Sequence, residues 1–101
     1  MAFKENLEAL PVAKGKQLLL LDESGVEAAV IVNGPGTSGS FRLYAYLAGK
    51  WGSINPDAAA EGLRLYAEHA EDAHQNPGKH PNIDRLMDVL TSGRIYSIRI
   101  L

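Results

Sequence analysis

The 101-residue sequence predicts one α+β domain, in which a three-stranded, mainly antiparallel sheet carries about four helices on one face. Two observations lead to this fold class. The segments with the apolar pattern of strands stand apart from the helical segments instead of alternating with them, as is typical of α+β domains. The 46% content of apolar residues is that of a folded domain, and no linker or repeat divides the chain. We therefore expect a single domain over residues 1–101.

The N-terminal third of the chain predicts a short helix followed by a β-hairpin. Three apolar residues with helical spacing form one stripe: Phe3, Leu7 and Leu10. Pro11 ends this helix, because the residue before a proline avoids the helical conformation. Gln17–Leu21 is apolar on both faces, as is typical of a strand in the centre of a sheet. The turn residues 22–25 connect it to a second strand over residues 26–32, which has one core face.

The middle of the chain predicts two helices. A glycine-rich loop over residues 33–40 precedes a largely buried helix over residues 41–51, whose apolar side chains cover most of its circumference. Asn55 and Pro56 form a favourable helix start, and the helix that follows extends without interruption to about Gln75.

The C-terminal quarter predicts one more helix and the third strand. Residues 76–78, Asn-Pro-Gly, interrupt the preceding helix. A further helix begins near Pro81 and ends at the Thr-Ser-Gly of residues 91–93. Residues 94–101 place apolar side chains on one face and polar side chains on the other, which is the pattern of a strand. The order of the three strands stays open at this point.

Residues 34–39 spell G-x-G-x-x-G between a predicted strand and a predicted helix, which is the spacing of a dinucleotide-binding loop. The context argues against that function, because a second helix follows where a parallel strand is needed, and Pro35 lacks an N–H donor. A weaker hypothesis stays open. Ser38 and Ser40 at a helix N-terminus, with Arg42 nearby, form a candidate ligand site for a small anion.

Histidine and aspartate residues between positions 69 and 80 suggest a metal site. His69 and Asp72 are three positions apart, so they lie on the same face of the predicted helix. His80 follows a turn that can fold it back toward His69. Imidazole and carboxylate groups are common metal ligands, and these three residues are the candidate set. The alternative is a polar, solvated helix face, because known two-histidine zinc signatures place the histidines four positions apart.

The segment around residues 76–85 suggests a second ligand site. Its prolines make the turn stiff, and helix capping accounts for several of its polar residues. No structural role follows from the sequence for Lys79, His80 or Arg85, and a rigid loop that carries such residues is a common binding site. The alternative is that these side chains are solvated or paired with Asp84 and Asp88.

Composition excludes several classes of function. Ten basic and twelve acidic residues give a net charge of −2, and neither half of the chain is basic, which argues against nucleic-acid binding. The chain has no cysteine, and no serine lies in a G-x-S-x-G or S-x-x-K motif, so we predict no catalytic residue and no cofactor. No segment has the apolar length of a membrane span or of a signal peptide, and we expect a cytoplasmic protein.

The segment N-P-G-K-H-P-N-I-D-R-L at residues 76–86 resembles the signature of a family of roughly hundred-residue bacterial proteins that form a domain of unknown function. Residues 3–7, 42–44 and 61–69 are similar to that family too, so the resemblance spans most of the chain. It implies a bacterial source and a small free-standing protein. It brings no activity, cofactor or catalytic residue.

The leading hypothesis is a small binding or protein-interaction module without catalytic activity. The outer strands of a small sheet have free edges, and residues 26–32 or 94–101 can pair with the same strand of a second copy to form a homodimer. The alternative hypothesis is an anion- or metal-binding protein with modest hydrolytic chemistry. In that case the histidine and aspartate cluster forms the site, and Lys79 and Arg85 hold the anion.

Overall fold

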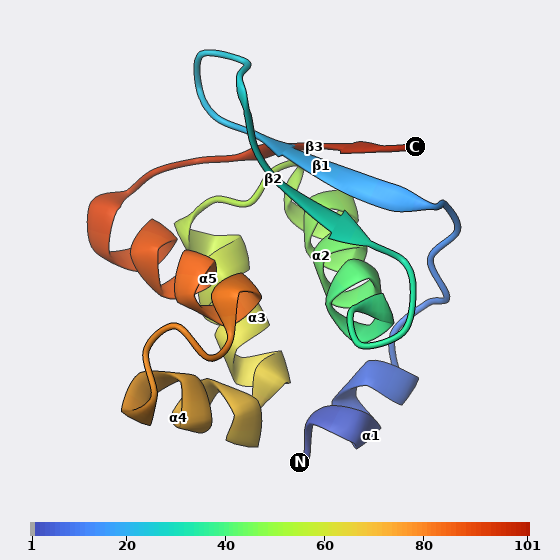
Figure 1. The fold of residues 1–101 in the computed structure, drawn as a ribbon, viewed down its shortest axis with the longest axis vertical. Coiled ribbons are helices and arrows are strands. Elements are labelled where there is room, and N and C mark those ends of the chain that lie inside the picture. The colour runs from blue at the N-terminus through green and yellow to red at the C-terminus, as the bar shows by residue number, and fades with distance from the viewer. Residues whose placement is uncertain (1) are drawn as a thin grey trace.

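The computed structural model describes residues 2–101 and confirms the predicted α+β class (Figure 1). Within these residues three strands form one antiparallel sheet, and five helices lie on one side of it. In chain order the elements are α1 (Phe3–Glu8), β1 (Gln17–Leu21), β2 (Glu27–Val32), α2 (Ser38–Trp51), α3 (Pro56–Tyr66), α4 (Glu68–Gln75), α5 (Pro81–Ser92) and β3 (Ser97–Ile100). None of these helices has the length and apolar character needed to cross a membrane.

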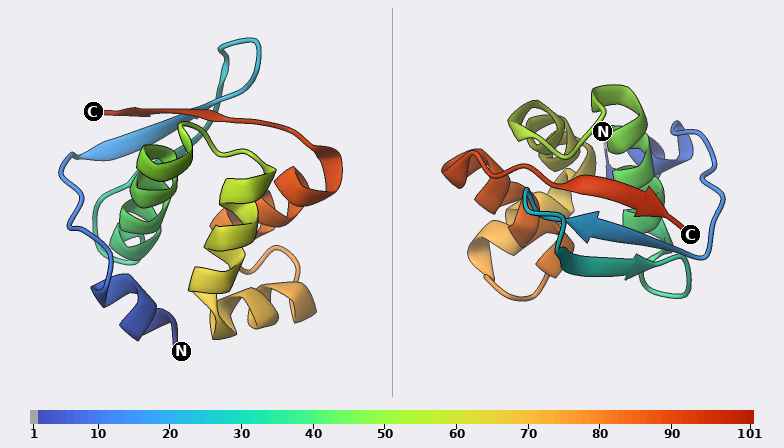
Figure 2. Two further views of the ribbon diagram at one scale, coloured as in Figure 1. Left: turned by 180° about the vertical axis from the view of Figure 1, so that it is seen from behind. Right: turned by 90° about the horizontal axis from the view of Figure 1, so that it is seen from above.

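The strand order is β2-β1-β3, so the leucine-rich strand occupies the centre of the sheet, as its composition predicted. β1 pairs with both neighbours in antiparallel orientation, and Leu18 lies opposite Ile31 of β2 and Ile100 of β3. Figures 1 and 2 show the helices on only one face of the sheet, while the other face is uncovered. Val30 and Val32 of β2 are accordingly 41% and 52% exposed.

The core lies between the inner face of the sheet and the helices. The sheet contributes Leu18, Leu20 and Ile31. α2 contributes Phe41, Leu43, Tyr44 and Leu47. A glycine allows α3 and α5 to approach closely: a Cβ atom on Gly62 would lie 2.7 Å from Leu86 and 2.8 Å from Leu47, which are both fully buried. The pattern of buried side chains therefore depends on a small residue at this helix crossing.

The prediction of one continuous helix to about Gln75 was wrong, because the chain turns at Ala67 and forms two helices there. Ala67 has φ 52° and ψ −118°, a conformation that residues with a Cβ atom rarely adopt. Contacts beyond the turn hold it in place. Glu68 accepts a hydrogen bond from the backbone N–H of Phe3 at 2.8 Å, and α4 packs against α5. The tertiary contacts of α4 therefore offset the local strain of the backbone at Ala67.

α2 begins at Ser38, so the loop predicted over residues 33–40 is shorter than expected. The hydroxyl of Thr37 donates to the carbonyl of Val32 at 2.6 Å, and the N–H of Ser38 donates to the carbonyl of Gly34 at 2.8 Å. These bonds fold the glycine-rich segment into a turn that leads directly into the helix. Ser38 and Ser40 consequently lie in the first turn of α2.

Replacing Ala67 by glycine tests the strain at the turn between α3 and α4. Glycine tolerates a positive φ, so we expect Ala67→Gly to raise the free energy of unfolding by about 1 kcal/mol. Ala60 lies exposed in the regular part of α3, and there the same replacement should lower the free energy of unfolding by about 1 kcal/mol. Equilibrium urea unfolding measures both variants. A loss of stability in Ala67→Gly would contradict the assigned strain.

Candidate functional site

Four segments that are distant in the sequence meet at two adjoining hollows, which we call the His80 cleft. The hollows measure about 190 and 460 Å³, and both are lined by Gly36, Ser40, Tyr66 and His80. The remaining lining residues are Phe3, Leu7, Thr37, Ser38, Gly39, His69, Lys79, Pro81, Asn82 and Ile83. The two ligand sites suggested separately by the sequence, at Ser38 and Ser40 and at Lys79 and His80, thus belong to one cleft.

A carboxylate on α4 holds the two basic residues of the turn that precedes α5. The Oδ2 atom of Asp72 lies 2.6 Å from Nε2 of His80 and 3.0 Å from Nζ of Lys79. These two hydrogen bonds lower the pKa of Asp72 to about 2, the bond to His80 having the larger effect. Asp72 is therefore ionised at neutral pH and fixes the orientation of the His80 ring.

The turn between α4 and α5 is fixed at both of its ends. Asn76 donates from its side chain to Oδ1 of Asp72 at 3.1 Å, and the N–H of Gly78 donates to Oδ2 of Asp84 at 2.9 Å. Gly78 has φ 92°, which its lack of a Cβ atom permits. Asp84 thus organises the turn instead of pairing with one of the basic residues considered from the sequence. The turn places Lys79 and His80 at the wall of the cleft.

Tyr66 forms the floor of the cleft together with a serine of α2. Its hydroxyl lies 2.7 Å from Oγ of Ser40, and burial raises the pKa of Tyr66. The ring of Phe3 from α1 stacks on Tyr66 with centroids 5.3 Å apart. The side of the cleft next to α1 is therefore aromatic, while the opposite side carries the charged groups.

The three candidate metal ligands lie near one another without forming a ligand set. His80 is bonded to Asp72, and the ring of His69 lies 5.9 Å from the ring of His80 and packs edge-on against Phe3. Among residues 2–101, no three histidine, aspartate or glutamate side chains form a group that could hold a metal ion. The observed geometry is a hydrogen-bonded pair, Asp72 and His80, beside a histidine, His69, that packs against the ring of Phe3.

The N-terminus of α2 offers unpaired backbone donors at the cleft. The side chain of Thr37 turns back to β2 and does not cap the helix. Within the described residues, the N–H groups of Gly39 and Ser40 have no acceptor. Such donors at the start of a helix, together with the helix dipole, favour an anion.

The two arginines that the sequence suggested as ligand residues do not line the His80 cleft. Arg42 donates to the carbonyl of Pro11 at 3.1 Å and to that of Leu10, which ties the chain after α1 to α2. Arg85 donates to the hydroxyl of Tyr44 at 3.1 Å and lies over its ring. Both guanidinium groups therefore hold parts of the fold together.

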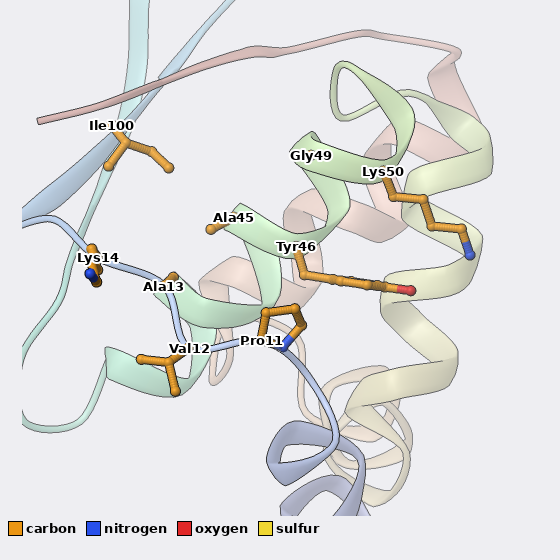
Figure 3. Close-up of a pocket in the computed structure, with 9 residues that line it drawn as sticks. All are labelled: Pro11, Val12, Ala13, Lys14, Ala45, Tyr46, Gly49, Lys50 and Ile100. Carbon is orange, nitrogen blue, oxygen red and sulfur yellow. The ribbon is translucent and has the colours of Figure 1, made fainter.

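A second depression, which the sequence analysis missed, lies along the C-terminal half of α2, and we call it the apolar groove (Figure 3). It measures about 430 Å³ and is lined by Pro11, Val12, Ala13, Lys14, Ala45, Tyr46, Gly49, Lys50 and Ile100. Its walls come from three segments that no local pattern connects. One available signal was the pair of small residues Ala45 and Gly49, which are four positions apart and so share a helix face.

The variant Asp72→Asn tests the charged side of the cleft. Asp72 has a pKa of about 2 in the folded protein against an ordinary value of 3.8, so its stabilising effect is complete well above pH 3.8 and is lost as the pH falls toward 2. We expect the variant to be less stable at neutral pH. Its free energy of unfolding should also fall less steeply across this acidic range. Urea unfolding at a series of pH values measures both effects, and equal slopes for the two proteins would contradict the assignment.

The comparisons with known proteins agree with the resemblance noted in the sequence. No curated protein and no solved structure matches the chain. The family described as "Uncharacterized protein conserved in bacteria (DUF2322)" matches residues 3–100, which is nearly the whole chain. The resemblance at residues 76–86 is therefore confirmed, and the chain belongs to this family of uncharacterized bacterial proteins.

Proposed function

We propose that this protein is a binding protein that holds a small anion, a phosphate or a carboxylate, in the His80 cleft. The observation that carries this proposal is the meeting of the α2 N-terminus with the turn that bears Lys79 and His80. The cleft combines an ammonium group, two unpaired backbone N–H groups and serine hydroxyls, all of which donate hydrogen bonds. Donors of this kind along one cleft are suited to oxygen anions.

The orientation of His80 adds a requirement on the ligand. Because Nε2 faces Asp72, the other ring nitrogen, Nδ1, is the one left for a ligand. Nδ1 donates a hydrogen bond when the ring is protonated, and it accepts one from a ligand hydroxyl when the ring is neutral. A hydrogen phosphate or a hydroxycarboxylate has both kinds of group and therefore fits the cleft better than a simple halide.

The contacts of Ser40 favour binding over nucleophilic catalysis. A serine nucleophile needs a general base in hydrogen-bond contact with its hydroxyl. Oγ of Ser40 is bonded to the hydroxyl of Tyr66, and no hydrogen bond joins it to His80 in residues 2–101. Ser40 thus resembles a ligand-orienting group more than the nucleophile of a triad.

Titration with inorganic phosphate, followed by amide NMR shifts, tests the anion proposal. We expect saturable shifts at Gly39, Ser40 and Lys79, and no comparable shifts at the apolar groove. Lys79→Met removes a charged donor, which should weaken binding about tenfold or more. Lys16→Met removes the same charge outside both depressions and serves as the control. The absence of saturable shifts, or equal losses in the two variants, would count against the proposal.

A second candidate function, self-association through β2, has its own observation in the structure. β2 is an outermost strand, and its exposed valines continue the row formed with Leu19 of β1 across the uncovered face. The free edge of the other outer strand is shorter, because β3 spans only Ser97–Ile100 and Tyr96, just before it, already pairs with Ile54. A two-fold pairing of β2 with the same strand of a second copy would extend this apolar row. It would also give hydrogen-bond partners to backbone groups at the outer edge of β2.

The variant Val30→Lys tests self-association. A lysine on an edge strand opposes pairing with another copy, so the variant should be monomeric where the natural protein is dimeric. Leu90→Lys places the same charge at an exposed apolar position of α5 and should leave the dimer intact. Light scattering after size-exclusion chromatography gives the mass of each species. A natural protein that is monomeric at every concentration would eliminate this candidate.

A further inference from the structure

One wall of the apolar groove is formed by Ile100 at the outer edge of β3. β1 occupies the other side of this strand, where the N–H of Leu101 donates to the carbonyl of Gln17 at 2.9 Å. In an antiparallel ladder the peptide groups alternate between the two sides of a strand, so those of Ile98 and Ile100 face away from β1. Tyr96 shows that this side accepts a further strand, because it exchanges two hydrogen bonds with Ile54, at 2.8 and 3.1 Å.

The part of α2 that faces β3 across the groove has little side-chain bulk, whereas Tyr46 and Lys50 line the groove farther from β3. Figure 3 shows Ala45 and Gly49 across the open space from Ile100. A Cβ atom added to Gly49 would meet no atom within 4 Å. The helix therefore leaves room beside β3 for the side chains of another chain.

The second wall is the segment that connects α1 to β1. Arg42 holds this segment against α2 through the carbonyl of Pro11. In the described part of the chain, the backbone groups of residues 12–14 make no hydrogen bond. Unpaired peptide groups thus border the groove on two sides. An extended peptide can satisfy such groups along its length, whereas an apolar small molecule cannot.

The charges at the groove select the kind of peptide. Two lysines line it, and none of its nine lining residues is acidic. Lys50 is paired with Glu61 at 2.9 Å, whereas Lys14 has no ion pair within residues 2–101. On a chain with a net charge of −2, this local excess of positive charge favours an acidic partner.

We propose that the apolar groove binds an extended, acidic peptide segment of another protein, which adds to β3 as a fourth strand. Alternate side chains of the peptide, small and apolar, lie on Ala45 and Gly49, while its carboxylates face Lys14. This is the strand-addition mode of peptide recognition, in which main-chain bonds supply affinity and a groove selects side chains. The inference is independent of the anion proposed for the His80 cleft.

An array of synthetic peptides tests the proposal directly. Each peptide has about seven residues, the length of an ordinary strand, with Asp or Glu alternating with Ala, Val, Leu or Ile. Binding to the full chain is measured by fluorescence anisotropy. For the tightest binder we expect amide NMR shifts at Lys14, Gly49 and Ile100, and slower hydrogen exchange of the N–H groups of Ile98 and Ile100. Proline in the centre of the same peptide removes a main-chain donor and should weaken binding about tenfold or more.

Substitutions in the groove provide the matched test on the protein side. Gly49→Leu places a side chain in the groove at a position where an added Cβ atom meets nothing within 4 Å, so it should abolish binding, while helix propensity keeps the variant folded. Ala60→Leu adds the same side chain at an exposed position of α3 and should bind like the natural protein. Lys14→Glu should reverse the preference, so that lysine-containing peptides bind better than acidic ones.

Three results would overturn the proposal. The first is that no peptide of the array binds. The second is that the proline-containing peptide binds as well as its parent, which would show that the groove holds apolar side chains without strand addition. The third is that the shifts fall on β2, which would assign the interaction to the opposite edge of the sheet.

Discussion

The burial of Leu18 and Leu20 is the constraint on which the rest of the structure depends. Both side chains are 0% exposed, and full burial of a leucine contributes about 1.5–3 kcal/mol. A strand that is covered by helices on its inner face is most stable with a neighbour on each side, which makes β1 central and leaves β2 and β3 as edges. The same arrangement places α2 beneath the sheet, and both depressions of the surface adjoin α2. The positions of both depressions are therefore consequences of how the central strand is buried.

The strained turn at Ala67 has a comparable role for the His80 cleft. A straight continuation of α3 would carry Asp72 along the axis of that helix, away from the start of α5. The turn redirects α4 so that the carboxylate of Asp72 meets His80 at 2.6 Å. Strained backbone is frequent at functional sites, where surrounding contacts hold it. Here the strain and the polar cluster belong to the same structural unit.

The sequence predicted the parts of the fold that depend on local patterns. The central strand followed from a short leucine run, and the start of α3 followed from Asn55, whose side chain accepts a hydrogen bond from Ala58 at 2.8 Å. The break at Ala67 had no local signal, because alanine is a strong helix former and neither glycine nor proline marks the position. The start of α2 was placed too late because the bond from Thr37 to Val32 joins two different elements.

The sequence identified individual residues of the candidate site but not how the fold brings them together. Ser38, Ser40, Lys79 and His80 were each identified from local context, yet only the fold shows that they line one cleft. Arg42 and Arg85 were also identified as candidate ligand residues from their local sequence context. Arg42 donates to two backbone carbonyls, and Arg85 donates to the hydroxyl of Tyr44 and to Oδ1 of Asn82. The partners of Arg42 and the tyrosine partner of Arg85 are distant in the sequence, so the spacing of residues gives no sign of them.

The N-terminal segment connects the two depressions physically. Phe3 of α1 lines the His80 cleft, and residues 11–14 of the same segment line the apolar groove. A helix of six residues is not stable alone, so α1 depends on its tertiary contacts. These contacts include the bond from the N–H of Phe3 to Glu68, the bond from the side chain of Asn6 to the carbonyl of Leu65 at 3.1 Å, and the stacking of the Phe3 ring on Tyr66. Since Arg42 also holds the chain after α1 against α2, the contacts of one N-terminal segment determine the shape of both depressions.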